Sequence, residues 1–168
     1  WAGFRLIRVF RPDVIHVHFA VPAGALAWIL SRITRVPYVL TAHLGDVPGG
    51  VPEKTGAWFR WIFPFTRFVW RGASTRVAVS EFTRELALQH YNAEILVIPN
   101  GVDPESVKSD SITLNDPAVL VFAGRFMPQK APLQVIRMLH QLKGNSWKCI
   151  MIGDGPLRAE AKKAVADS

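Results

Sequence analysis

The chain has 168 residues, of which 49% are apolar and 20% are charged; this composition favours a packed core and excludes a disordered chain. The formal net charge is +7, and all of this excess lies in residues 1–76, which hold ten Lys or Arg against three Asp or Glu, so that this half is expected to face an acidic partner or a membrane. No apolar run is long enough to cross a bilayer, and the single cysteine, Cys149, excludes an intramolecular disulfide.

In the first part of the chain, short apolar segments alternate with helical patterns. Four strands are expected there, at 13–19, 37–42, 75–79 and 94–98. A helix is expected at about 23–33, between the first two strands. Ser80 directly follows the third strand and is expected to be an N-cap, with Phe82, Leu86 and Leu88 forming the apolar face of its helix.

A polar segment, 103–117, contains Asp, Ser, Lys, Asn and two Pro and is typical of a linker. After it the alternation resumes with strands at 119–123 and 148–152. Helices are expected to begin at Pro132, with an apolar side made by Leu133, Ile136, Leu139 and Leu142, and at Pro156. Strand and helix alternating in this way predict an α/β fold with two parallel sheets, each covered on both faces. The domain boundaries are placed at 1–110, 111–117 for the linker, and 118–168.

Two cations follow the strand at 119–123. Arg125 comes directly after Gly124, and Lys130 comes five residues later, just before a helix. Ligands of open α/β sheets bind at the carboxyl ends of strands, and helix N-termini favour anions. Gly124 would allow close backbone approach, and Gly153 and Gly155, at the end of the next strand, could form a neighbouring wall. This pattern fits either a phosphate-binding loop or a solvated loop.

Five stretches in serial order carry a resemblance that spans nearly the whole chain: "RPDVIHVHF", "VAVSEFTRELALQHY", "VIPNGVD", "VFAGRFMPQKAPLQVI" and "MIGDGP". Together they resemble the GT-B glycosyltransferases of family 4, which are retaining enzymes that use nucleotide-diphosphate sugars. The resemblance implies two Rossmann-like domains, with residues 1–110 from the acceptor-side domain and 118–168 from the start of the donor-binding domain. It also implies transfer of a sugar, with retention, to a glycan or lipid-linked acceptor.

The same resemblance implies roles for individual residues. Arg125 and Lys130 would hold the donor diphosphate and offset charge as it leaves, and Gly124, Gly153 and Gly155 would line that site. No cofactor and no metal ion would be required.

On the acceptor side, His43 would lie beside the reacting sugar, with a purely structural histidine as the alternative. Asp46 would either orient the acceptor or cap its own loop, and His18 would lie near the cleft. A common form of this motif has glycine after the histidine, where this chain has Leu44. A zinc site built from His16, His18 and His43 is not expected, because the spacing fixes no complete ligand set.

Family members also carry a Gly-rich loop before these motifs and a Glu-x7-Glu element after them. The chain shows neither and does not begin with methionine, so we expect a fragment that is inactive alone. Two alternatives remain open at this point: a nucleotide-sugar epimerase of GT-B fold, and a non-catalytic module that binds nucleotide sugars.

The stretch Trp58–Arg71 combines bulky aromatic residues with three arginines. It fits a core helix, with Pro64 expected to interrupt any long amphipathic surface. The alternative is a segment that docks on an anionic membrane through aromatic and arginine side chains. The expected location is cytoplasmic, either free or peripheral at the inner membrane face. Nucleic acid is not expected as a partner, because no nucleic-acid-binding module is present.

Overall fold

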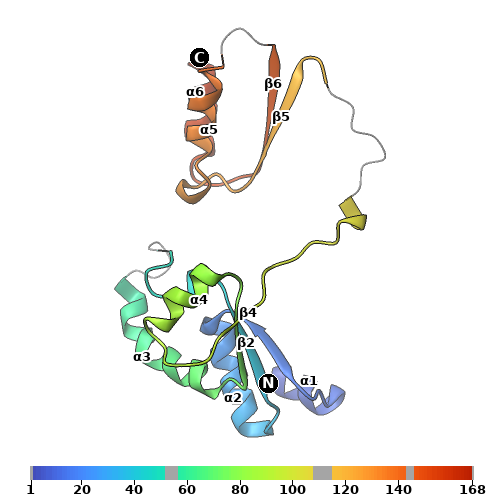
Figure 1. Cartoon of the computed structure of the whole chain (residues 1–168), viewed down its shortest axis with the longest axis vertical. Coiled ribbons are helices and arrows are strands. Elements are labelled where there is room, and N and C mark those ends of the chain that lie inside the picture. The colour runs from blue at the N-terminus through green and yellow to red at the C-terminus, as the bar shows by residue number, and fades with distance from the viewer. Residues whose placement is uncertain (1, 52–56, 108–114, 143–145, 168) are drawn as a thin grey trace. The chain divides into compact units, whose positions relative to one another are not determined.

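The computed structural model describes residues 2–51, 57–107, 115–142 and 146–167. Backbone contacts divide the chain into two units, Trp1–Asp103 and Pro104–Ser168 (Figure 1). The linker boundaries expected at 110 and 117 stay predictions, because residues 108–114 lie outside the described residues.

The first unit is built on a four-stranded parallel sheet. Its strands follow the order β1-β2-β3-β4 and have the bounds β1 (Ile15–His18), β2 (Tyr38–Ala42), β3 (Thr75–Ala78) and β4 (Leu96–Val97). All four lie inside the segments expected from the sequence. The predicted α/β class with parallel sheets is confirmed.

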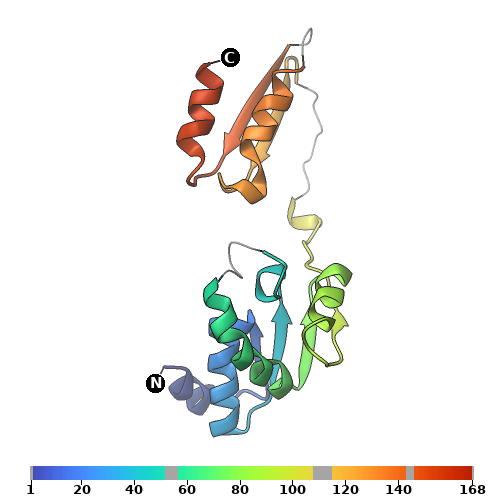
Figure 2. The ribbon, with the colours of Figure 1, turned by 90° about the vertical axis from the view of Figure 1, so that its left-hand side faces the viewer.

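Four helices belong to this sheet: α1 (Ala2–Phe10), α2 (Ala25–Thr34), α3 (Ala57–Gly72) and α4 (Glu81–Leu88). Figures 1 and 2 show α2 and α3 over one face of the sheet. Helix α1 was not predicted; it packs beside α2, where Leu30 lies against Gly3. The expected interruption at Pro64 was wrong, because α3 runs through this residue. Proline removes a single backbone donor, and a helix anchored by its buried side tolerates this loss.

The core of the first unit is centred on aromatic residues, two of which, Tyr38 and Tyr91, have hydrogen-bonded hydroxyl groups. Trp70 stacks on Tyr91 with ring centroids 4.2 Å apart, and the Tyr91 hydroxyl lies 2.9 Å from Thr66 Oγ1. The Tyr38 hydroxyl donates to the carbonyl of Val69, which links β2 to α3. Both tyrosine hydroxyls therefore have a hydrogen-bond partner.

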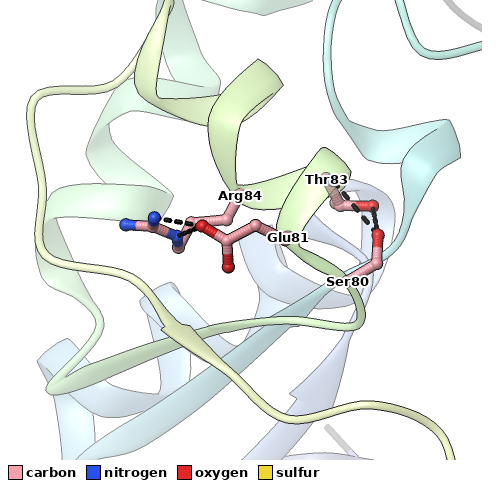
Figure 3. Close-up of polar contacts among 4 residues, drawn as sticks. All are labelled: Ser80, Glu81, Thr83 and Arg84. Carbon is pink, nitrogen blue, oxygen red and sulfur yellow. Dashed lines mark hydrogen bonds and ion pairs between the residues drawn. The ribbon is translucent and has the colours of Figure 1, made fainter.

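Helix α4 begins as expected but buries a different side. Ser80 Oγ accepts a hydrogen bond from the backbone N–H of Thr83 at 3.2 Å, so the predicted N-cap is confirmed (Figure 3). Thr83 and Ala87 are buried, whereas Phe82 is 63% exposed. The predicted apolar face of Phe82, Leu86 and Leu88 is therefore wrong apart from Leu86, which packs on the core.

The second unit has two parallel strands, β5 (Ala118–Ala123) and β6 (Trp147–Ile152), and two helices, α5 (Pro132–Leu139) and α6 (Arg158–Ala166). Its core contains Phe126, Ile136 and Ala161. Leu142, expected on the apolar side of α5, lies beyond the end of this helix and is exposed.

The expectation that helices cover both faces of each sheet is not met by the described part of the second unit. Val121 and Ile152 are 61% and 57% exposed, while the opposite side of the strands faces the helices.

The buried tyrosines give a direct test of the first unit. Burial raises the pKa of the Tyr38 hydroxyl to about 12, against the lowering effect of Arg76 and Arg32, and burial likewise raises the pKa of Tyr91 to about 12. In the unfolded chain both would ionise near pH 10. The stability that comes from keeping them neutral is therefore complete below about pH 10 and is lost as pH rises through 12.

We expect ultraviolet titration of tyrosinate to show no ionisation at pH 10 in the folded chain, whose only two tyrosines are these. The denatured chain in urea is the control and should ionise near pH 10. Ionisation of either tyrosine near pH 10 while the fold persists would contradict this packing.

Candidate functional site

Two loops at the carboxyl end of the second sheet are joined through their backbones. The N–H of Gly124, after β5, donates to the carbonyl of Ile152 at 3.0 Å, and the N–H of Phe126 donates to the carbonyl of Asp154 at 2.8 Å. The carbonyl of Phe126 in turn accepts from Leu157 at 2.9 Å. The loops after β5 and β6 therefore form one rigid platform.

Glycine at two positions permits this approach. Gly153 and Gly155 have φ angles of +144° and +151°, which side-chain-bearing residues rarely adopt. A Cβ atom at Gly153 would lie 2.0 Å from the carbonyl oxygen of Gly124, and one at Gly155 would lie 2.5 Å from that of Phe126. Both distances are far below van der Waals contact, so these residues fix how closely the loops meet.

The two predicted cations project from this platform. Arg125 lies between the two backbone bonds that join the loops, and Lys130 ends a helical turn, Pro128–Lys130, in which its N–H donates to the carbonyl of Met127 at 3.0 Å. Both side chains are exposed, and among the described residues neither forms an ion pair. The Lys130 stem passes beside Gly124, since its Cγ would lie 3.7 Å from a Cβ there. Arg125, Lys130 and the three glycines thus lie together.

One carboxylate lies near these cations. Asp154 Oδ1 accepts from the N–H of Gly155 at 2.8 Å and lies 3.8 Å from Arg158 Nη1. Because its negative charge is engaged by its own loop and by Arg158, the platform keeps a positive character. It can hold an anion with several oxygens, for which the arginine fork and the lysine point charge are suited.

In the first unit, the predicted acceptor-side residues also lie together. His18 is paired in register with Thr41, and its Nδ1 lies 3.1 Å from His43 Nε2, so that one ring N–H donates to the other ring. The N–H of His43 donates to Asp46 Oδ2 at 3.0 Å, and the N–H of Asp46 donates back to the His43 carbonyl at 2.9 Å. Asp46 is buried and holds the His43 loop closed, as the loop-capping alternative expects.

Two further residues at this edge were missed by the sequence analysis. Phe19 stacks on His43 with ring centroids 4.7 Å apart, and its φ of +74° is unusual for a residue with a side chain. Thr41 Oγ1 lies 2.9 Å from His16 Nε2. Phe19 directly follows β1, and Thr41 pairs in register with His18 near the end of β2. The position of both residues at strand ends was the signal in the sequence that could have pointed to them.

No group of three or more His, Cys, Asp or Glu that could hold a metal ion is present in the described ranges. The absence of a metal from donor binding stays a prediction.

Comparisons with known proteins identify the family. The sequence profile of Glycosyltransferase Family 4 matches residues 1–106, which is more than half of the chain. The chain belongs to Glycosyltransferase Family 4. The resemblance inferred from the serial motifs is thereby confirmed.

Two curated relatives show how much of a family member is present. A "Putative teichuronic acid biosynthesis glycosyltransferase TuaC" of Bacillus subtilis is 30% identical over 162 residues, which cover 90% of this chain and 40% of the relative. A "2-deoxystreptamine glucosyltransferase" of Streptomyces kanamyceticus is 27% identical over 189 residues, which cover 98% of this chain and 48% of the relative. The chain therefore spans less than half the length of these two relatives.

Solved structures support the fold. The crystal structure of TarM matches 98% of this chain and 33% of its own, with a TM-score of 0.64 and 14% identity. A mutant of S. aureus TarM, in complex with Fondaparinux, alpha-GlcNAc-glycerol and UDP, matches with a TM-score of 0.61 and 12% identity. At this identity the likeness establishes the GT-B fold and nothing finer.

The loop platform predicts a specific glycine requirement. Gly153→Ala should destabilise the second unit by about 1–3 kcal/mol, because the added Cβ would meet the Gly124 carbonyl and force a strained φ. Gly101→Ala is the matched control, since a Cβ there would meet no atom within 4 Å. Hydrogen exchange of the β5 and β6 amides measures the effect. Equal protection in the two variants would show that the close approach is not a constraint.

Proposed function

We propose that this chain forms part of a retaining glycosyltransferase that moves a sugar from a nucleotide-diphosphate donor to a hydroxyl group of a glycan or lipid-linked acceptor. The observation that carries the proposal is the platform of Gly124, Arg125, Lys130, Gly153 and Gly155 in a family 4 chain. Two relatives with glycosyltransferase or glucosyltransferase in their names support it, as does a structure of similar fold that was solved in complex with UDP. The proposal concerns a full-length enzyme, because the chain spans only part of its relatives.

On the donor side, Arg125 and Lys130 would bind the diphosphate. When the bond between the anomeric carbon and the diphosphate oxygen breaks, its electron pair passes to the diphosphate, whose negative charge rises. Two cations already held by a rigid platform stabilise that charge more in the transition state than in the ground state. We propose that they do so without a metal ion.

On the acceptor side, His43 would lie beside the donor sugar or the acceptor hydroxyl and hold it by hydrogen bonding. His18 is bonded to His43 and Phe19 is stacked on it, so both restrict how the His43 ring turns. Asp46 fixes the backbone from which the ring projects. Such positioning of the reacting groups lowers the entropic part of the barrier.

The cations are tested by single substitutions in the full-length enzyme. Arg125→Ala and Lys130→Ala should each lower kcat by roughly 10²–10³, rather than only raise KM, because they act as the diphosphate departs. Lys130→Arg should restore little activity, since a planar guanidinium does not replace a compact ammonium in a fitted site. Steady-state kinetics with donor and acceptor measure both effects.

Arg137→Ala is the matched control, because Arg137 is an exposed cation on α5 away from the loops. Wild-type kcat and donor affinity in folded Arg125→Ala and Lys130→Ala enzymes would exclude the proposed diphosphate site. Product formed from donor alone, without acceptor, would instead favour an epimerase.

His43 should behave differently from the cations. His43→Ala should lower turnover while leaving nucleoside-diphosphate affinity nearly unchanged, because the histidine is assigned to the sugar side. Calorimetric binding of the nucleoside diphosphate, measured beside kcat, separates the two effects. A loss of diphosphate affinity equal to the loss of turnover would contradict this assignment.

A further inference from the structure

Helix α3 presents a stripe of large aromatic side chains to solvent. Its inner side is buried through Thr66, Val69 and Trp70, whereas the opposite side exposes Trp61, Phe65 and Phe68, which are 83%, 67% and 56% exposed. The three exposed residues are spaced by four and three positions, so they form one stripe along the helix. Exposed aromatic residues grouped in this way mark an interaction surface rather than an ordinary solvated face.

Arginines lie beside this stripe on both sides. Arg67 and Arg71, one helical turn apart on α3, are exposed. On α2, the Arg32 guanidinium lies 5.6 Å from the centroid of the Trp28 ring, and this ring lies 6.3 Å from that of Phe68. The aromatic stripe of α3 and the arginine of α2 therefore belong to one surface. We call the surface made by Arg32, Trp61, Phe65, Arg67, Phe68 and Arg71 the α2/α3 surface.

The sequence of the three helices contains no negative charge. Within the bounds of α1, α2 and α3 there are six arginines and no Asp or Glu. A solvated helix usually carries both positive and negative side chains, so a surface with only positive side chains calls for a negatively charged partner. Among the described residues no helix is long and apolar enough to span a membrane.

From this charge complementarity and the exposed aromatic stripe, we propose that the α2/α3 surface docks on an anionic phospholipid bilayer. Trp61, Phe65 and Phe68 would enter the boundary between headgroups and acyl chains, where amphipathic aromatic rings are favoured. The arginines would contact lipid phosphates and carboxylates. The proposal stands on the surface of the first unit and does not depend on the proposed sugar transfer.

The first experiment measures how much of the chain co-sediments with vesicles of two compositions. One contains phosphatidylcholine alone, and the other contains phosphatidylcholine with phosphatidylglycerol. We expect binding to the vesicles with phosphatidylglycerol and little binding to phosphatidylcholine alone. Raising salt from about 0.1 M to about 1 M shortens the Debye length from ~10 Å to ~3 Å and should release most of the protein. Equal binding to both vesicles, or no binding by the folded chain, would overturn the proposal.

The second experiment compares matched double variants. Arg67→Ser with Arg71→Ser should weaken binding by about 30-fold, the factor that ~1 kcal/mol per arginine gives. Arg137→Ser with Lys163→Ser removes the same charge from exposed positions of the second unit and should bind like the wild type. An equal loss of vesicle binding in both double variants would show that binding depends only on net charge, and it would overturn the proposal.

A third variant tests the aromatic stripe without altering charge. Trp61→Ser should weaken vesicle binding several-fold and leave the circular dichroism spectrum unchanged, because this side chain is 83% exposed. Unchanged vesicle binding would contradict insertion of the stripe. Binding of single-stranded RNA that competes with the vesicles and is weakened by the same substitutions would assign the surface to nucleic acid instead.

Discussion

The close backbone approach of two strand-end loops determines what the second unit can bind. Hydrogen bonds from Gly124 to Ile152 at the end of β6, and from Phe126 to Asp154 in the loop after it, hold the two loops together. Gly153 and Gly155 leave the space for this approach. Because the backbone partners are fixed, the cations beside them project from a rigid base rather than from a free loop. Charge placed in advance is worth more in catalysis than charge that must first be ordered.

The first unit also presents candidate ligand-binding side chains from a rigid strand end, but these side chains are histidines. Parallel strands bring His18 and His43 to one edge of the sheet, and the buried carboxylate of Asp46 closes the loop on which His43 sits. The rigid part is again a strand end, while the side chains that could meet a ligand stand at the surface. The proposed function assigns the sugar donor to one of these edges and the acceptor to the other.

The strands and the strand-end residues could be predicted from the sequence because apolar runs and glycine positions report them directly. The position of Phe19 at a strand end could be predicted, but its stacking on His43 could not, since that contact depends on an unusual backbone angle after β1. The buried side of α4 was also missed, because close packing favours the small Thr83 and Ala87 over the larger Phe82. Pro64 was read as a helix breaker, although packing of the surrounding turns keeps α3 continuous. Tertiary contacts decided each of these cases against the local signal.

The account rests on the joined loops after β5 and β6 as the site of the donor diphosphate. The most direct measurement is nuclear magnetic resonance of the isotope-labelled chain titrated with nucleoside diphosphates and with pyrophosphate, which detects even weak binding. The account predicts shifts of the backbone amides within 124–130 and 153–155, with Arg125→Ala reducing them. Shifts confined to other parts of the chain, or equally large in the Arg125→Ala variant, would contradict it.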